Sequence, residues 1–128
     1  MIVVDASALV AIADEEPDAD DLLTIIGGQD AVMSPINYVE TGLILIGRRR
    51  LAARADLDAW LDQLGIAVHA EDSLAGEALA AYLRFGRGFH PARLNLGDCF
   101  AYALARALDA PLLYKGDDFT LTDVRAAT

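Results

Sequence analysis

The 128-residue sequence predicts an α/β fold with a mainly parallel sheet of four to five strands and helices on both of its faces. Three observations support this prediction. Short apolar segments alternate with amphipathic helical segments along the chain. Asp5 and Asp118 lie at or just past the ends of apolar segments, where parallel sheets bind ligands. The length and the 55% hydrophobic content fit one globular domain covering residues 1–128.

The first predicted elements are bounded by residues that start or stop helices. The apolar run of residues 2–4 predicts a buried strand, and residues 6–14 form a helix that ends before Pro17. An amphipathic helix over residues 18–26 is closed by Gly27-Gly28. The chain is therefore expected to begin with one strand followed by two helices.

A strong helix start follows the second predicted strand, residues 31–33. Ser34 can cap a helix, and Pro35 suits its first position. We expect this helix to extend to about Arg50, where consecutive arginines favour the C-terminal end of the helix dipole. Beyond it, the predicted helices cover residues 57–64, 73–84 and 96–108. The remaining predicted strands are residues 66–68 and 112–114, with a loop at residues 86–93.

The charge and the cysteine content restrict the classes of function. The formal net charge of −10 alone argues against a nucleic-acid partner. A cation bound in one pocket would reverse the local sign, however. The single cysteine, Cys99, excludes an internal disulfide and suits a reducing cytoplasm. The sequence has no basic N-terminal region and no apolar run of about 20 residues, so we expect a cytoplasmic protein without a membrane span.

Four acidic residues lie where a carboxylate is locally unusual. They are Asp5 at the end of the first strand, Glu40 within an apolar helical segment, Asp98 at the start of the last helix and Asp118 after the last strand. Carboxylates near apolar packing are unfavourable unless they are hydrogen-bonded, paired or bound to a cation. Carboxylates that converge repel one another, so a hard divalent ion is the simplest explanation for all of them together.

Local explanations exist for these carboxylates one at a time. Asp5 could cap the following helix, with Ser7 close enough to donate a hydrogen bond to it. Glu40 could be salt-bridged at the surface. Asp98 could form a capping box with Asn95. Each explanation is compatible with a place in a shared site.

The pair of aspartates after the last strand leaves one assignment open. Asp117 and Asp118 both lie in a turn, where aspartate often forms local hydrogen bonds. We favour Asp118 as the fourth carboxylate of the site and keep Asp117 as the alternative.

Basic residues indicate where a polyanion could bind. Arg84, Arg87 and Arg93 flank the loop that leads to Asp98, with Phe89 available for base stacking. These arginines are candidate RNA contacts. Alternatively, the loop is merely solvated, or the same arginines face an acidic protein segment.

Four motifs together resemble the PIN domain. They are Asp5-Ala6-Ser7, Asn37-Tyr38-Val39-Glu40, Leu94-Asn95-Leu96-Gly97-Asp98-Cys99 and Lys115-Gly116-Asp117-Asp118-Phe119. In the order and spacing of these motifs, the chain is most similar, over essentially its whole length, to the VapC-type toxins of bacterial toxin–antitoxin pairs.

This resemblance implies a Mg²⁺- or Mn²⁺-dependent endoribonuclease that is held inactive by a small VapB-type antitoxin and is usually a homodimer. It places Asp5, Glu40, Asp98 and Asp118 in the family's acidic quartet, with Ser7 as the neighbouring hydroxyl. Asp5 and Asp98 would be the principal metal ligands. Glu40 and Asp118 would act through water or orient the attacking water.

Three other functions fit parts of the pattern. A phosphoryl-accepting receiver domain would use a late lysine such as Lys115, but it needs an acidic pair at the first strand. A haloacid-dehalogenase-type phosphatase needs a second Asp two residues after Asp5, where Ser7 stands. A non-catalytic, nuclease-like binding module would act only through partners. The complete set of four carboxylates favours the metal-dependent nuclease over all three.

Overall fold

Four parallel strands form one sheet in the order β3-β2-β1-β4 in the computed structural model, which describes residues 1–70 and 74–128. The strands are β1 (Ile2–Val4), β2 (Ala31–Met33), β3 (Ile66–Val68) and β4 (Leu112–Leu113). In register, Val3 pairs with Val32 on one side and with Leu112 on the other. The predicted α/β fold and its four to five parallel strands are thus confirmed.

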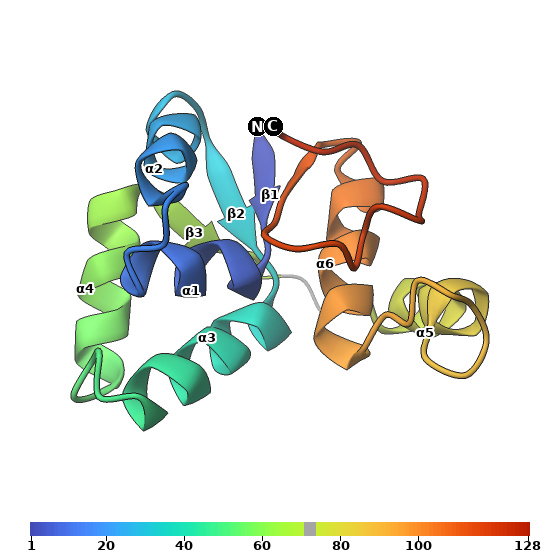
Figure 1. The fold of residues 1–128 in the computed structure, drawn as a ribbon, viewed down its shortest axis with the longest axis horizontal. Coiled ribbons are helices and arrows are strands. Elements are labelled where there is room, and N and C mark those ends of the chain that lie inside the picture. The colour runs from blue at the N-terminus through green and yellow to red at the C-terminus, as the bar shows by residue number, and fades with distance from the viewer. Residues whose placement is uncertain (71–73) are drawn as a thin grey trace.

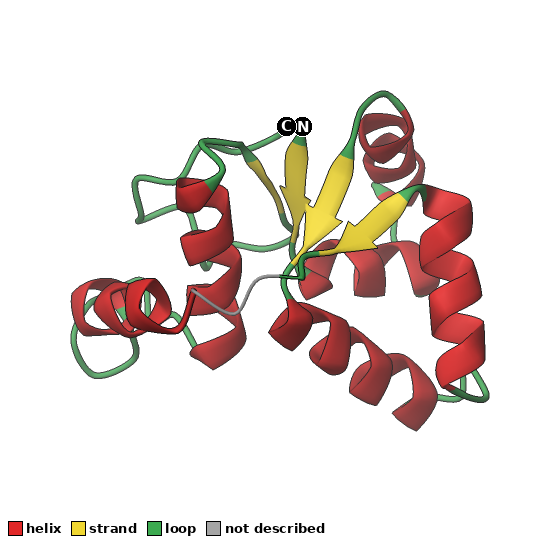
Figure 2. Cartoon of the chain, turned by 180° about the vertical axis from the view of Figure 1, so that it is seen from behind, coloured by secondary structure: helices red, strands yellow, loops and turns green. Residues whose placement is uncertain are grey.

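Helices cover both faces of this sheet (Figures 1 and 2). They are α1 (Ala6–Ala13), α2 (Ala19–Gly27), α3 (Pro35–Gly47), α4 (Arg54–Leu64), α5 (Leu74–Phe85) and α6 (Leu96–Ala107). Every predicted helix is present, although the predicted start of α5, Ser73, lies outside the described residues. Within the described part of the chain, no helix is long and apolar enough to cross a membrane.

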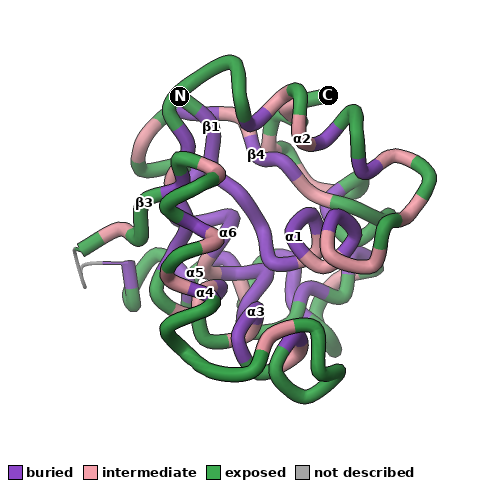
Figure 3. Tube along the Cα trace, turned by 90° about the vertical axis from the view of Figure 1, so that its left-hand side faces the viewer, coloured by how far each residue is buried: buried purple, intermediate pink, exposed green. Residues whose placement is uncertain are grey.

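The core has two parts because alternate residues of a strand point to opposite faces of the sheet. Val3 belongs to the cluster that α5 and α6 cover. Its neighbours Ile2 and Val4 belong to the cluster formed with α1, α2 and α4. Figure 3 shows β1 and β4 buried inside, with most of the connecting loops exposed. The edge strand β3 is exposed at Ala67 and Val68. The sheet therefore supplies a rigid centre, and functional side chains can be placed at its edge.

Two helix boundaries differ from the prediction. Helix α3 ends at Gly47 rather than near Arg50, and both Arg48 and Arg50 bind Asp14 at the end of α1, at 2.6 and 3.1 Å. Helix α4 begins at Arg54 instead of Leu57. Its start was not recognised because Ala53 has no capping side chain. The Asp56 carboxylate instead accepts the Ala53 backbone N–H at 3.0 Å.

The topology brings the carboxyl ends of β1 and β4 together, since these strands are adjacent and parallel. The backbone N–H of Lys115, just after β4, donates to Oγ of Ser7, just after β1, at 3.0 Å. Helix α3 lies beyond the carboxyl ends of the strands (Figures 1 and 2), where it contacts both α1 and α6. The segments after β1 and β4 and the helices α3 and α6 consequently meet at the carboxyl end of the sheet.

Candidate metal centre and active site

A pocket of about 260 Å³ lies at this end of the sheet, and all four of the predicted carboxylates line it. They are Asp5 after β1, Glu40 on α3, Asp98 on α6 and Asp118 after β4. We call this the acidic pocket. The sequence prediction that these remote acids share one place therefore agrees with the structure.

Asp5 is buried, with an exposed fraction of 4%, and it has two structural tasks. Its carboxylate caps α1 by accepting the Ser7 backbone N–H at 3.1 Å. The same oxygen accepts the Ser7 hydroxyl at 2.6 Å. The expected helix cap and the expected contact with Ser7 are both present. They fix the carboxylate so that it faces the acidic pocket.

Glu40 is held by an amide that the sequence did not identify as part of the site. The side chain of Asn37 is fully buried, and its Nδ2 donates to Glu40 Oε1 at 2.9 Å and to the Gly97 carbonyl at 3.1 Å. Nδ2 also lies 3.5 Å from Asp5 Oδ1. On its other side, Asn37 Oδ1 accepts the Ser34 hydroxyl at 2.7 Å. One amide thus joins α3, α6 and the end of β1.

Gly97 allows the close approach of α3 and α6. A Cβ atom on Gly97 would overlap the carboxylate of Glu40. Only glycine therefore leaves room for Glu40 at this place. In the sequence, Gly97 was visible only as a member of the motif around Asp98, because its importance depends on a side chain from another helix.

Asp98 forms the capping box that was considered as its alternative role. Asp98 Oδ2 accepts the Asn95 N–H at 3.0 Å, and Asn95 Oδ1 accepts the Asp98 N–H at 2.8 Å. The residue is 7% exposed and also lines the acidic pocket. Capping and a place in the site are thus combined in one carboxylate.

Burial and mutual repulsion make the two most buried carboxylates hard to ionise. Burial raises the pKa of Asp5 to about 6, and repulsion from Glu40 and Asp118 contributes in the same direction. The hydrogen bonds from Ser7 lower this pKa but do not outweigh burial. Burial raises the pKa of Asp98 to about 7, and the charges of the other three carboxylates contribute in the same direction. The acidic pocket therefore favours binding of either protons or a cation.

The structure separates the two neighbouring aspartates of the last loop. Asp118 lines the acidic pocket, whereas Asp117 lines only an adjoining pocket of about 510 Å³. Only Asp118 of this pair contributes to the raised pKa values of Asp5 and Asp98. The geometry therefore favours Asp118 over Asp117 as the fourth carboxylate.

The three candidate RNA-contacting arginines are not together. Arg87 and Arg93 line the adjoining pocket with Asp98 and both loop aspartates. Arg84 points elsewhere, to Asp123 at 3.5 Å, and stacks its guanidinium 4.5 Å from the Phe85 ring centre. Only Arg87 and Arg93 are thus next to the carboxylates.

Comparison with known proteins agrees with this architecture. The sequence model of the PIN domain matches residues 2–124. The chain belongs to the PIN domain family. It is 46% identical to Ribonuclease VapC of Mycolicibacterium smegmatis over 98% of both chains. It is 42% identical to Ribonuclease VapC30 of Mycobacterium tuberculosis, covering 96% of this chain and 95% of that one. Within the PIN family it therefore groups with the VapC ribonucleases.

A solved structure shows the same fold. The sarcin–ricin-loop-cleaving toxin VapC20 of Mycobacterium tuberculosis superimposes with a TM-score of 0.71 over 97% of this chain and 96% of that one. At 20% sequence identity, this similarity supports the PIN fold and leaves the substrate of the present chain open.

The donor set of the acidic pocket fits a hard cation, although the side chains are not arranged around one. Among residues 1–70 and 74–128, no group of three His, Cys, Asp or Glu side chains is placed so that it could hold a metal ion as it stands. Carboxylate oxygens are nonetheless the ligands that Mg²⁺ and Mn²⁺ prefer. Lys115, the lysine that a receiver domain would use, also lines the acidic pocket, but its ammonium pairs with Asp18 at 2.9 Å.

Proposed function

We propose that this PIN domain is the ribonuclease toxin of a VapBC-type toxin–antitoxin pair, a metal-dependent endoribonuclease that hydrolyses RNA phosphodiester bonds. The observation that supports this most strongly is the lining of one small pocket by carboxylates from four separate segments. The VapC ribonucleases at 42 and 46% identity support the same activity.

The proposed cofactor is Mg²⁺, with Mn²⁺ as a substitute. Asp5 and Asp98 are the proposed direct ligands, because burial, with added repulsion from the other carboxylates, raises the pKa of each, and a bound cation would offset that cost. A bound divalent cation would offset the charge of the phosphate and favour ionisation of a water molecule. Glu40 and Asp118 then orient the attacking water and accept its proton. Ser7 keeps the Asp5 carboxylate turned towards the pocket.

The RNA backbone is proposed to cross the pocket that adjoins the carboxylates. Arg87 and Arg93 line that pocket and can neutralise phosphates on either side of the cleaved bond. Arg84 is left out of this role because it binds Asp123. The two arginines offset the overall charge of −10 only locally, where the substrate has to bind.

We also propose a cytoplasmic location and two protein partners. A VapB-type antitoxin would inhibit the enzyme by covering the acidic pocket and the two arginines of the adjoining pocket. A second copy of the chain would cover the apolar side chains that α3 and α5 leave exposed. On α3 these are Val39, Leu43 and Ile46, and on α5 they are Leu79 and Leu83. Residues spaced by three or four positions form one stripe on a helix, as an interface requires.

The direct test is cleavage of single-stranded RNA by the purified chain, with Mg²⁺, with Mn²⁺ and with a chelator. We expect cleavage only when a divalent ion is present, and loss of cleavage in Asp5→Asn. Cleavage that survives this substitution, or that persists after chelation, would rule out the proposed mechanism.

A further inference from the structure

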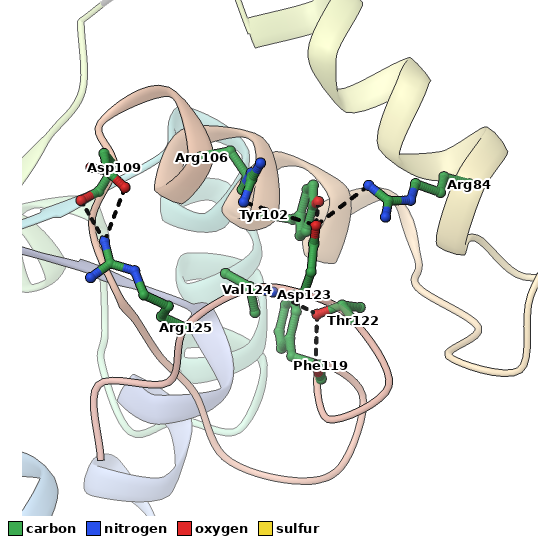
Figure 4. Close-up of polar contacts among 9 residues, drawn as sticks. All are labelled: Arg84, Tyr102, Arg106, Asp109, Phe119, Thr122, Asp123, Val124 and Arg125. Carbon is green, nitrogen blue, oxygen red and sulfur yellow. Dashed lines mark hydrogen bonds and ion pairs between the residues drawn. The ribbon is translucent and has the colours of Figure 1, made fainter.

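The carboxylate of Asp123 is bound by three side chains from two helices (Figure 4). Tyr102 of α6 donates its hydroxyl to Oδ1 at 2.5 Å. Arg84 of α5 and Arg106 of α6 lie 3.5 and 3.9 Å from Oδ2. We call Asp123 with these three partners the loop clasp. It joins the C-terminal segment to the helices on one face of the sheet.

The loop that the clasp secures carries Asp118. Segment 114–124 leaves the sheet after β4 and returns beside it, where Leu112 forms a bridge with Ala126. Asp118 is exposed, and in the part of the chain that the structure describes no group donates a hydrogen bond to its carboxylate. Its position therefore depends on how the backbone on either side of it is anchored.

Anchors lie on both sides of Asp118. Before it, the Lys115 N–H binds Ser7 at 3.0 Å. After it, Phe119 is 2% exposed and packs against the Tyr114 ring in a tilted arrangement, with 5.0 Å between ring centres. The Thr122 hydroxyl donates to the Phe119 carbonyl at 2.7 Å (Figure 4), and the clasp follows at the next residue. The turn that the Thr122 hydroxyl closes begins at Phe119, directly after Asp118. The clasp thus fixes the far end of this turn.

The protonation states of the clasp are constant near neutral pH. Burial and the hydrogen bond to Asp123 raise the pKa of Tyr102 to about 12, so its hydroxyl remains a donor. The hydrogen bond from Tyr102, followed by the charges of the two arginines, lowers the pKa of Asp123 below its usual value. A charged acceptor with a neutral donor forms a strong and directional hydrogen bond.

We propose that the loop clasp is a positioning element of the metal site: Asp123 and Tyr102 hold the loop so that the Asp118 carboxylate remains at the acidic pocket. The inference rests on the proposed function, because the position of Asp118 affects the reaction only if the pocket binds a cation. Neither Asp123 nor Tyr102 lines the acidic pocket, so both act through Asp118.

The molecule contains a matched pair for a control. Asp58 on α4 accepts the Tyr38 hydroxyl at 2.6 Å and pairs with Arg54 at 3.4 Å. Its side chain is 45% exposed, compared with 40% for Asp123. Asp58→Asn therefore removes the negative charge from the same kind of interaction, away from the loop that carries Asp118.

The test measures Mn²⁺ affinity by calorimetry, together with kcat and KM for RNA cleavage, in Asp123→Asn and Tyr102→Phe. Tyr102→Phe keeps the ring in the core, where it packs 5.4 Å from Phe85, and removes only the hydroxyl. We expect the Kd for Mn²⁺ to rise about three- to tenfold and kcat to fall by a similar factor, with KM unchanged. Asp58→Asn should change neither quantity.

A double-mutant cycle separates positioning from general destabilisation. If the clasp acts through Asp118, adding Asp123→Asn to Asp118→Asn causes no further loss of Mn²⁺ affinity. Unchanged Mn²⁺ affinity and kcat in both clasp variants, while Asp118→Asn weakens both, would overturn the clasp and leave the proposed function standing. Equal losses in Asp58→Asn would also overturn it. Absence of Mn²⁺ binding by the unaltered chain would overturn the proposed function and the clasp together.

Discussion

The acidic pocket has two regions that are supported in different ways. Asp5 and Asp98 are 4 and 7% exposed, and each is held by backbone N–H groups at the start of a helix. Asp118 is exposed and reaches the same pocket from a loop. In the proposed mechanism, the buried region holds the cation directly, while the loop region depends on the anchors of its backbone. Support from helix starts and support from an anchored loop are thus divided between different parts of one site.

The two regions also differ in electrostatics. Burial raises the pKa values of Asp5 and Asp98 to about 6 and about 7. In the metal-free protein at neutral pH, ionised carboxylates in the buried region therefore lower the free energy of unfolding. Ligand binding to the folded state alone stabilises it, so a divalent cation should restore the lost stability.

The largest effect is expected from neutralising the buried region. Asp98→Asn keeps an oxygen that can accept the Asn95 N–H, so the helix cap remains while the charge is lost. Even residues one step removed from a metal ion change activity by about 10- to 100-fold. We therefore expect RNA cleavage to fall by more than about 100-fold, while the thermal unfolding midpoint of the metal-free protein does not fall, because a buried charge has been removed.

Asp56→Asn is the matched control for that substitution. Asp56 caps α4 through the Ala53 N–H at 3.0 Å and lies outside the acidic pocket. Loss of the Asp56 charge should leave RNA cleavage unchanged. If both variants lose cleavage equally, the lost charge of a capping residue, and not the loss of a pocket carboxylate, explains the effect of Asp98→Asn.

Gly97→Ala disturbs the buried region without changing a charge. The added methyl group overlaps the Glu40 carboxylate, so α3 and α6 have to separate or Glu40 has to turn away. We expect cleavage to fall by about 10- to 100-fold and the free energy of unfolding to fall by about 1–3 kcal/mol. Urea unfolding and RNA cleavage measure the two quantities.

Gly76→Ala on α5 is the corresponding control, because a Cβ atom there meets no atom of the described residues within 4 Å beyond its own helix backbone. This substitution should leave cleavage intact and raise stability by about 0.5–1 kcal/mol, since alanine favours helices more than glycine does. Unimpaired cleavage in Gly97→Ala would mean that the contact between Gly97 and Glu40 has no part in the site.

The loop region should respond less strongly than the buried one. Asp118→Asn removes an exposed carboxylate that lines the acidic pocket, and we expect about a tenfold loss of cleavage, as for a residue that acts on a metal ion through water. Asp117→Asn should have a smaller effect, because Asp117 lines only the adjoining pocket. A larger loss in Asp117→Asn than in Asp118→Asn would reverse this assignment.

Changes in pH should affect stability through the buried region. Asp5 has a pKa of about 6 in the folded state and 3.8 as a free side chain, so the folded state binds its proton more tightly. The metal-free protein should therefore lose stability as pH rises from about 4 to about 7, by on the order of 3 kcal/mol from Asp5 alone. Saturating Mn²⁺ should abolish the decline, because the cation favours the ionised carboxylates.

Urea unfolding across this pH range, with and without Mn²⁺, measures the effect. Asp98, with a folded-state pKa of about 7, contributes in the same direction and extends the decline towards neutral pH. A metal-free protein that becomes more stable over the same range would show that the carboxylates are not destabilised by burial.

The sequence was most informative where the signal is local. Ser34 and Pro35 mark the start of α3, and the Asn95–Asp98 capping box marks that of α6, because each depends on neighbours within three residues. The carboxylates themselves were recognisable because acidic residues are unusual beside apolar segments. Their common pocket followed from strand polarity, which places the carboxyl ends of parallel strands at one edge.

Contacts between distant segments could not be predicted in the same way. Asn37 bonds to the Gly97 carbonyl 60 residues away, and nothing in the sequence around either residue indicates that contact. Arg84 was grouped with Arg87 and Arg93 by proximity in the sequence, yet it binds Asp123. In each case the partner is determined by helix packing, which the sequence pattern does not specify.

A crystal structure of the chain soaked in Mn²⁺, with anomalous diffraction recorded at the manganese edge, tests the central claim most directly. We predict an anomalous peak in the acidic pocket, with oxygens of Asp5 and Asp98 bound to it and those of Glu40 and Asp118 turned towards it. A fully occupied peak elsewhere on the protein, or none within reach of Asp5 and Asp98 at saturating Mn²⁺, would contradict the account.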